Sequence, residues 1–184
     1  MKRQIALVAL ALSLVASLAM AADDESVDVS DPAAPTSKVA RTAAGYYLGL
    51  GLGAGEVEDC GVKTAVSLQF GYRVNQNFRM DLSINGVSYS KDSAVSSIST
   101  VGYGTLPINH GKIVPYAGLG FGHLSFSWKE DGKQKDANSE WGLALAAGTD
   151  FVLNRNWAAA VDLRYQSGSG VSLTQVTGGL KYYF

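Results

Sequence analysis

The chain has 184 residues, a formal net charge of −1 and a hydrophobic fraction of 47%. Loss of two basic residues, Lys2 and Arg3, with the N-terminal segment described below takes the charge from −1 to −3, so nothing in the charge favours nucleic acid as a partner. The single cysteine, Cys60, excludes an internal disulfide. With 21 glycines and only 4 prolines, the composition favours closely packed strands over a helical fold.

The first 21 residues have the three parts of a secretory signal peptide. A charged start precedes an apolar run, and Ala19 and Ala21 form a small-x-small cleavage site. We expect cleavage after Ala21, with Ala22 as the alternative. A membrane anchor is the weaker interpretation, because the run is shorter than the roughly 20 residues of a spanning helix and acidic residues follow at once. The mature protein is therefore predicted to be exported.

Residues 22–44 are acidic and contain Pro and Ala but almost no large apolar side chains. Such a segment cannot bury enough surface to offset its ordering entropy, so we predict a disordered periplasmic leader. A tail that binds peptidoglycan or a partner is the alternative. A second domain, a barrel, is predicted over residues 45–184.

Apolar side chains alternate with small or polar ones along eight segments of this second domain. A period of two is that of a β-strand, and the segments lie at about residues 45–53, 63–74, 78–90, 93–108, 113–122, 141–151, 157–165 and 171–184. Tight turns are expected at residues 75–77, 110–112 and 154–156, and the longest connection at 128–139. We expect a bulge near Gly86, where Val87 changes face. The serine-rich segment 93–108 leaves its own face open.

The apolar face is predicted to point outward, toward lipid. A soluble lipocalin-type barrel is the structural rival, but the large side chains of this face would overfill the narrow interior of eight strands. The opposite face is rich in glycine, which suits a crowded lumen. The aromatic residues also gather at the tight-turn ends, as at a bilayer interface: Tyr72, Phe78, Phe151, Trp157, Tyr182 and Phe184. The predicted fold is an all-β, eight-stranded antiparallel up-and-down transmembrane β-barrel.

Several of these features together resemble the small outer-membrane barrel family, which includes OmpA-like transmembrane domains, OmpX and opacity-type surface antigens. The features are the signal peptide, the alternating strands, the segment Pro115–Gly122 and the ending Tyr182-Tyr183-Phe184. The resemblance implies the outer membrane of a Gram-negative bacterium, and it covers about residues 45–184. It also implies that a C-terminal assembly signal, Leu180, Tyr182 and Phe184, is recognised by the barrel-insertion machinery. The chain ends with the barrel, so the peptidoglycan anchor of full-length OmpA is not implied.

Seven charged residues fall on the inward face: Arg73, Arg79, Asp81, Asp150, Asp162, Arg164 and Lys181. Unpaired charges in a confined lumen are costly, so these residues should pair with each other or with trapped water. We predict a salt-bridged plug that stabilises the barrel. A selectivity filter for small ions is the alternative.

Catalytic candidates are few. His123 and Ser125 share a face near the outer rim, with Glu140 close by, and this group resembles the site of lipid A deacylase barrels. However, the strand phase points Glu140 inward, and Phe126 replaces the polar residue that follows serine in that motif, so no base with its orienting partner is in reach. His110 is expected in a solvated turn. Cys60, beside acidic residues in an outer loop, is not expected to be catalytic.

The sequence therefore predicts a non-enzymatic, monomeric outer-membrane barrel with a largely plugged polar lumen and a structural or surface role, such as envelope integrity or adhesion. No cofactor, metal or nucleic acid is expected, and lipid and lipopolysaccharide are the expected partners besides the insertion machinery. A small porin-like channel is the alternative, and an outer-leaflet lipid A hydrolase a weaker one. The charged hairpin near Lys129 is expected to be solvated, and the other outer loops look short.

Overall fold

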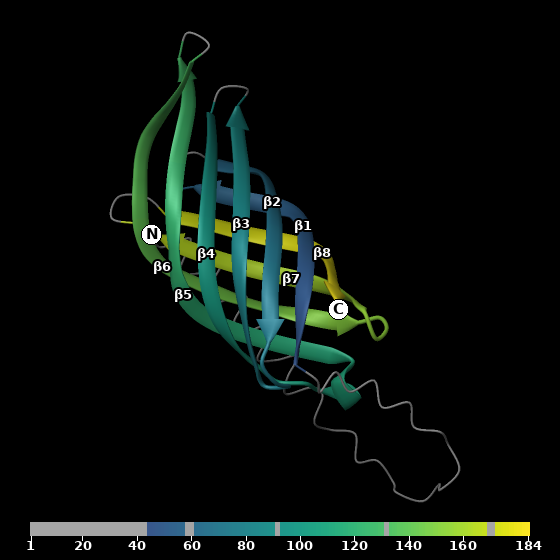
Figure 1. Ribbon diagram of the computed structural model, residues 1–184. Helices are drawn as coiled ribbons and strands as arrows, with labels where there is room; N and C mark the ends of the chain where they lie inside the picture. The colour runs from purple at the N-terminus through teal and green to yellow at the C-terminus, as the bar shows by residue number, and fades with distance from the viewer. Residues whose placement is uncertain (1–43, 58–60, 91–92, 131–132, 169–171) are drawn as a thin grey trace, which may run out of the picture.

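The computed structural model describes residues 44–57, 61–90, 93–130, 133–168 and 172–184. These residues form eight antiparallel strands and one short 3-10 turn, η1 (Asn109–Gly111). The strands are β1 (Gly45–Val57), β2 (Gly61–Arg73), β3 (Phe78–Ser90), β4 (Ser93–Thr105), β5 (Ile113–Glu130), β6 (Lys133–Val152), β7 (Trp157–Ser167) and β8 (Ser172–Tyr183). Each strand pairs with its sequence neighbour, and β1 pairs with β8, which closes the barrel (Figure 1). The predicted fold is confirmed.

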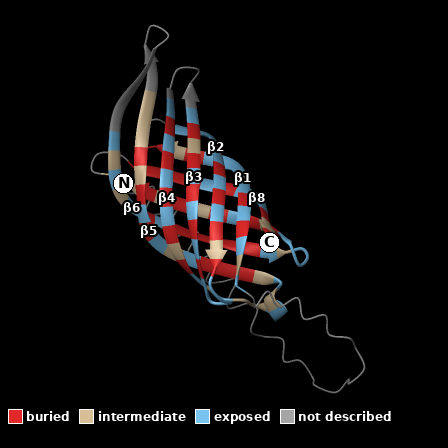
Figure 2. Ribbon diagram, in the orientation of Figure 1, coloured by how far each residue is buried: buried red, intermediate tan, exposed pale blue. Residues whose placement is uncertain are grey.

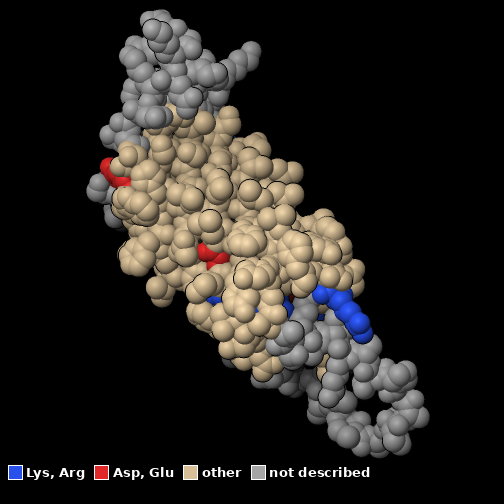
Figure 3. Space-filling view, viewed as in Figure 1, with Lys and Arg blue, Asp and Glu red and all other residues tan. Residues whose placement is uncertain are grey.

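The period of two in the sequence becomes an apolar outer wall and a buried inner wall. Leu50 and Leu52 of β1 point outward and are 64% and 67% exposed, whereas Tyr47 of the same strand points inward and is fully buried. Buried and exposed positions alternate along β2 and β3 in Figure 2. The face seen in Figure 3 is mostly uncharged, with Lys and Arg gathered toward one end. The apolar face therefore points away from the lumen, as predicted.

Aromatic rings meet one another at the tight-turn end of the barrel, where the chain also ends (Figure 1). Tyr46 stacks on Phe70 at a centroid distance of 5.8 Å, and Tyr182 packs edge-on against both Trp157 (5.0 Å) and Phe184 (5.1 Å). The Phe184 amide donates a hydrogen bond to the carbonyl of Tyr46 at 3.1 Å. The predicted clustering of aromatic residues at this end is confirmed.

Two hairpins rise beyond the opposite end of the barrel (Figure 1). The hairpin of β5 and β6 is the longer one, since these strands have 18 and 20 residues. The sequence predicts a long connection over residues 128–139, but the backbone pairing continues through Trp128↔Lys135 and Glu130↔Lys133. Backbone pairing needs no buried side chains, which is why hydrophobic alternation failed to indicate these parts of the strands.

The expected bulge near Gly86 is displaced, and its cause is different from the one assumed. Val87 keeps the inward phase of Asn85 and is 1% exposed, while the pairing with β4 becomes irregular between Ser88 and Ser90. Val87 points inward because the lumen near the hairpins contains a cluster of buried apolar side chains. The cluster consists of Val57, Ala65, Val87, Val95, Leu124 and Leu173.

The structure also shows which face of the serine-rich segment, residues 93–108, points inward. In β4 the side chains of Val95, Ser97, Ser99, Val101 and Tyr103 point inward and are buried. The strand ends at Thr105, before the predicted end at residue 108.

Some sequence predictions concern residues outside the described ranges. The signal peptide with Ala19 and Ala21, most of the leader and Cys60 belong to this group and remain predictions. Within the described ranges, no helix is long and apolar enough to cross a bilayer.

Candidate functional site

The lumen is the candidate site, because it collects the charged residues that the strand phase placed inside. Each of the seven is at most 9% exposed: Arg73, Arg79, Asp81, Asp150, Asp162, Arg164 and Lys181. They come from five strands, β2, β3, β6, β7 and β8. Their charged groups meet across the interior toward the tight-turn end.

Asp150 lies at the centre of the lower group of charges. Its carboxylate accepts hydrogen bonds from Arg79 on the opposite wall at 2.5 Å and from Lys181 at 2.9 Å. The Tyr183 hydroxyl donates a third hydrogen bond at 2.9 Å. Lys181 also lies 3.6 Å from Asp162, so one ammonium group joins two carboxylates.

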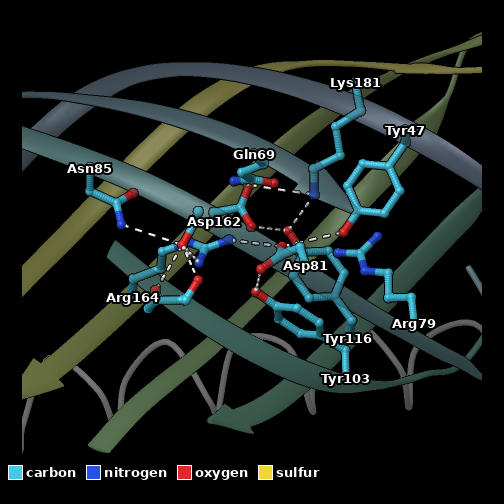
Figure 4. A network of polar contacts seen from close by, with 12 residues as sticks. Tyr47, Gln69, Arg79, Asp81, Asn85, Tyr103, Tyr116, Asp162, Arg164 and Lys181 are labelled. Carbon is cyan, nitrogen blue, oxygen red and sulfur yellow. Dashed lines mark hydrogen bonds and ion pairs between the residues drawn. The ribbon is translucent and has the colours of Figure 1, made fainter. Parts of the chain in front are cut away.

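Asp81 forms a second centre of charge in the lumen (Figure 4). Arg164 lies 3.1 Å from its carboxylate, and the hydroxyls of Tyr47 and Tyr103 donate to it at 3.3 and 3.1 Å. Asp162 and Arg164 share the inward face of β7, but each has its oppositely charged partner on another strand. Neighbouring inward side chains on one strand can reach different walls.

Four tyrosines take part in this site, and the sequence analysis did not include them. The Arg79 guanidinium lies 3.8 Å from the ring centroid of Tyr116, 5.0 Å from that of Tyr103 and 5.5 Å from that of Tyr47. Arg73 lies 4.5 Å above the Tyr183 ring. Nε and Nη2 of Arg79 meet no hydrogen-bond acceptor among the described residues, and the surrounding rings supply cation–π contacts there. The sequence contained a signal for three of them, because Tyr47, Tyr116 and Tyr183 fall on the small or polar face of their strands. The fourth, Tyr103, lies in the segment whose face the sequence left open.

Three of the inward tyrosines have room because each faces a glycine on the next strand. Tyr47 pairs with Gly71, and Tyr116 pairs with Gly148. A Cβ atom at either glycine would overlap the opposing tyrosine ring. Glycine at these positions therefore lets the rings lie flat against the barrel wall and direct their hydroxyls to the aspartates.

A layer of amide and hydroxyl side chains lies above the charges. Ser83 and Ser99 are hydrogen bonded at 2.8 Å, and Asn85 donates to Ser97 at 3.1 Å and accepts from Gln175 at 2.8 Å. Beside them is a void of about 10 Å³, lined in part by Arg164 and Gln166. A void of this size has room for about one water molecule.

The apolar cluster that includes Val87 and Leu124 lies above this polar layer, on the side of the hairpins. Phe126 packs against it. The lumen thus has a charged layer, an uncharged polar layer and an apolar layer in series. Ions crossing the barrel would have to displace ion pairs and then pass a layer in which six buried apolar side chains pack together, which side-chain packing of this kind opposes.

The candidate catalytic residues are not brought together. His123 points outward and packs against Trp141 at a centroid distance of 5.1 Å, whereas Glu140 belongs to the inward phase of the next strand. His110 lies in η1 with a positive φ of 55°. Among the described residues, no group of His, Cys, Asp and Glu is arranged to hold a metal ion.

The residues of the expected assembly signal lie on the outer wall. Leu180 and Phe184 are 49% and 73% exposed, and Tyr182 lies between them on the same face. They form one apolar edge of β8 at the end of the chain.

Comparison with known proteins places this geometry in a family. The family model described as the outer membrane protein beta-barrel domain matches residues 7–184. No curated protein matches the chain. Among solved structures, Neisserial surface protein A is 17% identical with a TM-score of 0.69 and covers 77% of this chain and 99% of its own.

Two further solved structures show the same fold. Ail, the attachment invasion locus protein of Yersinia pestis, is 18% identical with a TM-score of 0.57 and covers 77% of this chain and 97% of its own. The N-terminal barrel domain of Pseudomonas aeruginosa OprF is 13% identical with a TM-score of 0.60 and covers 77% of this chain and all of its own. On the strength of the family match, which spans nearly the whole sequence, the chain belongs to the outer membrane protein beta-barrel family.

Proposed function

We propose that this protein is a monomeric barrel of a Gram-negative outer membrane that acts at the cell surface or in envelope integrity, with a lumen closed to ions. The observation that carries the proposal is the series of three packed layers inside the barrel. Each charged group of Asp81, Asp150 and Arg164 has a partner of opposite sign within 3.1 Å. The attraction between these paired charges favours a rigid, packed barrel over an open pore.

The location rests on the outer wall and on the family. Apolar side chains cover the outside, and aromatic rings gather at one end, as lipid and its interface require. Export through a cleaved signal peptide, and recognition of Leu180, Tyr182 and Phe184 by the insertion machinery, are parts of the same proposal. Membrane lipid and lipopolysaccharide would then surround the barrel.

The surface role is supported by the hairpin of β5 and β6. A tilted strand needs about 9–11 residues to cross the bilayer, and these strands have 18 and 20. The excess projects from the barrel and carries Lys129, Glu130, Lys133 and Lys135 in its sequence. Among the similar structures, Ail is named for attachment and invasion, and one of its structures is a complex with a heparin analogue. A charged projecting hairpin fits a contact role in this chain too.

An enzymatic role is not part of the proposal. A hydrolase would need a base and its orienting carboxylate on one face. Here the His123 ring faces outward against Trp141, while Glu140 follows the inward phase.

A small channel is the alternative function, because the lower lumen is polar. Conductance across a planar lipid bilayer separates the two. We expect the purified protein to give no steady current, because neither the ion-paired layer nor the apolar layer leaves a file of water. Insertion is verified separately by gel electrophoresis, in which the unboiled protein should migrate differently from the boiled protein. Large, stable, ion-selective openings from inserted protein would establish the channel and contradict the proposal.

A further inference from the structure

A groove crosses the outer wall of the barrel over β5, β6 and β7. It has a volume of about 330 Å³, and its outward-facing lining residues are Ala117, Leu119, Leu145, Ala147, Leu163 and Tyr165. The lining forms two rows across the strands. One row is Ala117, Ala147 and Leu163, and the other is Leu119, Leu145 and Tyr165.

The hollow arises from two alanines between larger neighbours. Ala147 belongs to the outward phase, yet it is only 7% exposed. Leu119, in the next row, is 67% exposed. The leucines and Tyr165 thus surround a floor of small side chains.

The position and chemistry of the groove indicate what kind of molecule it can bind. It lies in the apolar outer wall, so lipid and not water faces it, and it is lined by no charged residue. Three adjacent strands span only about 10 Å, which is too narrow for the convex wall of a second barrel to enter. A volume of this size is at the small end of ligand pockets. A single hydrocarbon chain fits these dimensions.

Two outward-facing side chains above the groove, His123 and Trp141, indicate the leaflet. Trp141 is the tenth residue before Phe151, which lies at the tight-turn end, so it reaches the opposite bilayer interface. His123 pairs with Trp141 at this level and, like it, points outward. Indole and imidazole groups at this height suit the head-group region. The groove lies below them on the same strands, beyond the row of Phe121 and Leu143, near the middle of the apolar band, where an acyl chain descending from that head-group level ends.

We propose that the groove holds one acyl chain of a lipid in the external leaflet, with the head group of that lipid beside His123 and Trp141. This inference rests on the proposed membrane location. It gives the outward-facing histidine a role in lipid contact that requires no catalysis, and it makes β5–β7 the lipid-binding side of the barrel.

The test uses protein reconstituted in vesicles of dimyristoylphosphatidylcholine that contain a small fraction of a phosphatidylcholine with a diazirine in mid-chain. After irradiation, labelled residues are mapped by mass spectrometry. We expect labelling at the groove to exceed labelling at Leu68 and Ile84, which face lipid from β2 and β3. Equal labelling around the barrel would overturn the inference.

Filling the groove supplies the second comparison. Ala147→Leu should reduce labelling to the level of the reference positions, because the added side chain occupies the floor. Ala159→Leu is the matched control, since Ala159 faces outward on β7 but does not line the groove. Unchanged labelling in the Ala147→Leu protein would contradict the inference.

A gel-mobility assay for insertion keeps the outcomes distinct. If Ala147→Leu does not insert, Ala117→Leu replaces it, because Ala117 is exposed and an added side chain displaces nothing inside the barrel. If the unmodified protein itself does not insert, the proposed membrane function fails. If it inserts and labels uniformly, only the acyl-chain site fails.

Discussion

At the scale of single residues, the contacts between tyrosine rings and glycine set the geometry of the charged layer. Tyr47 lies over Gly71 and donates a hydrogen bond to Asp81 at 3.3 Å. Gly71 thus leaves room for the ring of Tyr47, and the hydroxyl of that ring binds the buried carboxylate of Asp81. The sequence contains this connection only as a tyrosine and a glycine of the same phase on paired strands.

Gly71→Ala should destabilise the barrel by about 1–3 kcal/mol, because the added Cβ overlaps the Tyr47 ring and forces it away from Asp81. The measurement is urea unfolding in lipid vesicles. Gly86→Ala is the control, since a Cβ there meets nothing within 4 Å. Equal stability of the two variants would show that Tyr47 is not fixed by this contact.

The pair of Asp81 and Arg164 makes a second prediction about single residues. Arg164→Ala should lower the free energy of unfolding by about 3–5 kcal/mol, because it leaves Asp81 buried without its cation. Arg155→Ala in the exposed turn after β6 should change it by less than about 0.5 kcal/mol.

A double-mutant cycle with Asp81→Asn and Arg164→Met then isolates the interaction between the two side chains. We expect the double variant to be less destabilised than the sum of the single variants. Simple additivity would contradict direct pairing at 3.1 Å.

At the scale of strands, the sequence was sufficient wherever one face is uniformly apolar. In β1, Leu48, Leu50 and Leu52 alternate with tyrosine and glycine, so phase and direction could be predicted. In β4 the rule fails, because Ser96 faces outward while Ser97 and Ser99 face inward. Because serines lie on both faces of this strand, apolar and polar residues do not alternate clearly, and the inward face cannot be predicted.

The partners of the buried charges could not be read from the sequence, although their inward direction could. Arg164 and Asp81 are 83 positions apart and meet only because the closed barrel brings β7 opposite β3. Strand stagger around a barrel sets which depths coincide, and alternation carries no information about stagger. The groove at Ala147 was missed for a related reason, since it depends on side-chain size across three strands.

The upper apolar layer gives a prediction at the same scale. Leu124 is fully buried in it, so Leu124→Ala should destabilise the barrel by about 2–5 kcal/mol through lost packing and a residual cavity. Leu143→Ala is the control on the neighbouring strand, because Leu143 is 54% exposed on the outer wall. Unfolding in lipid vesicles measures both. A larger loss for Leu143→Ala would reverse the assignment of inner and outer faces.

At the scale of the whole molecule, the closed pairing of β1 with β8 and the apolar outer wall act together. The closed pairing leaves no strand edge open, so backbone groups are hydrogen bonded without help from water. A large exposed wall of leucine, phenylalanine and tryptophan marks a contact surface, and in an outer-membrane barrel this surface faces lipid. In the lumen, paired charges and packed apolar side chains stabilise the inner face of the same strands.

Cell fractionation combined with gel electrophoresis of the unboiled protein tests this account most directly. A closed membrane barrel resists detergent, so the protein should be found in the outer-membrane fraction and migrate differently before and after boiling. Both properties follow from an apolar wall that faces lipid. A soluble periplasmic pool that folds without detergent and shows no such mobility difference would contradict the account and establish a lipocalin-like barrel instead.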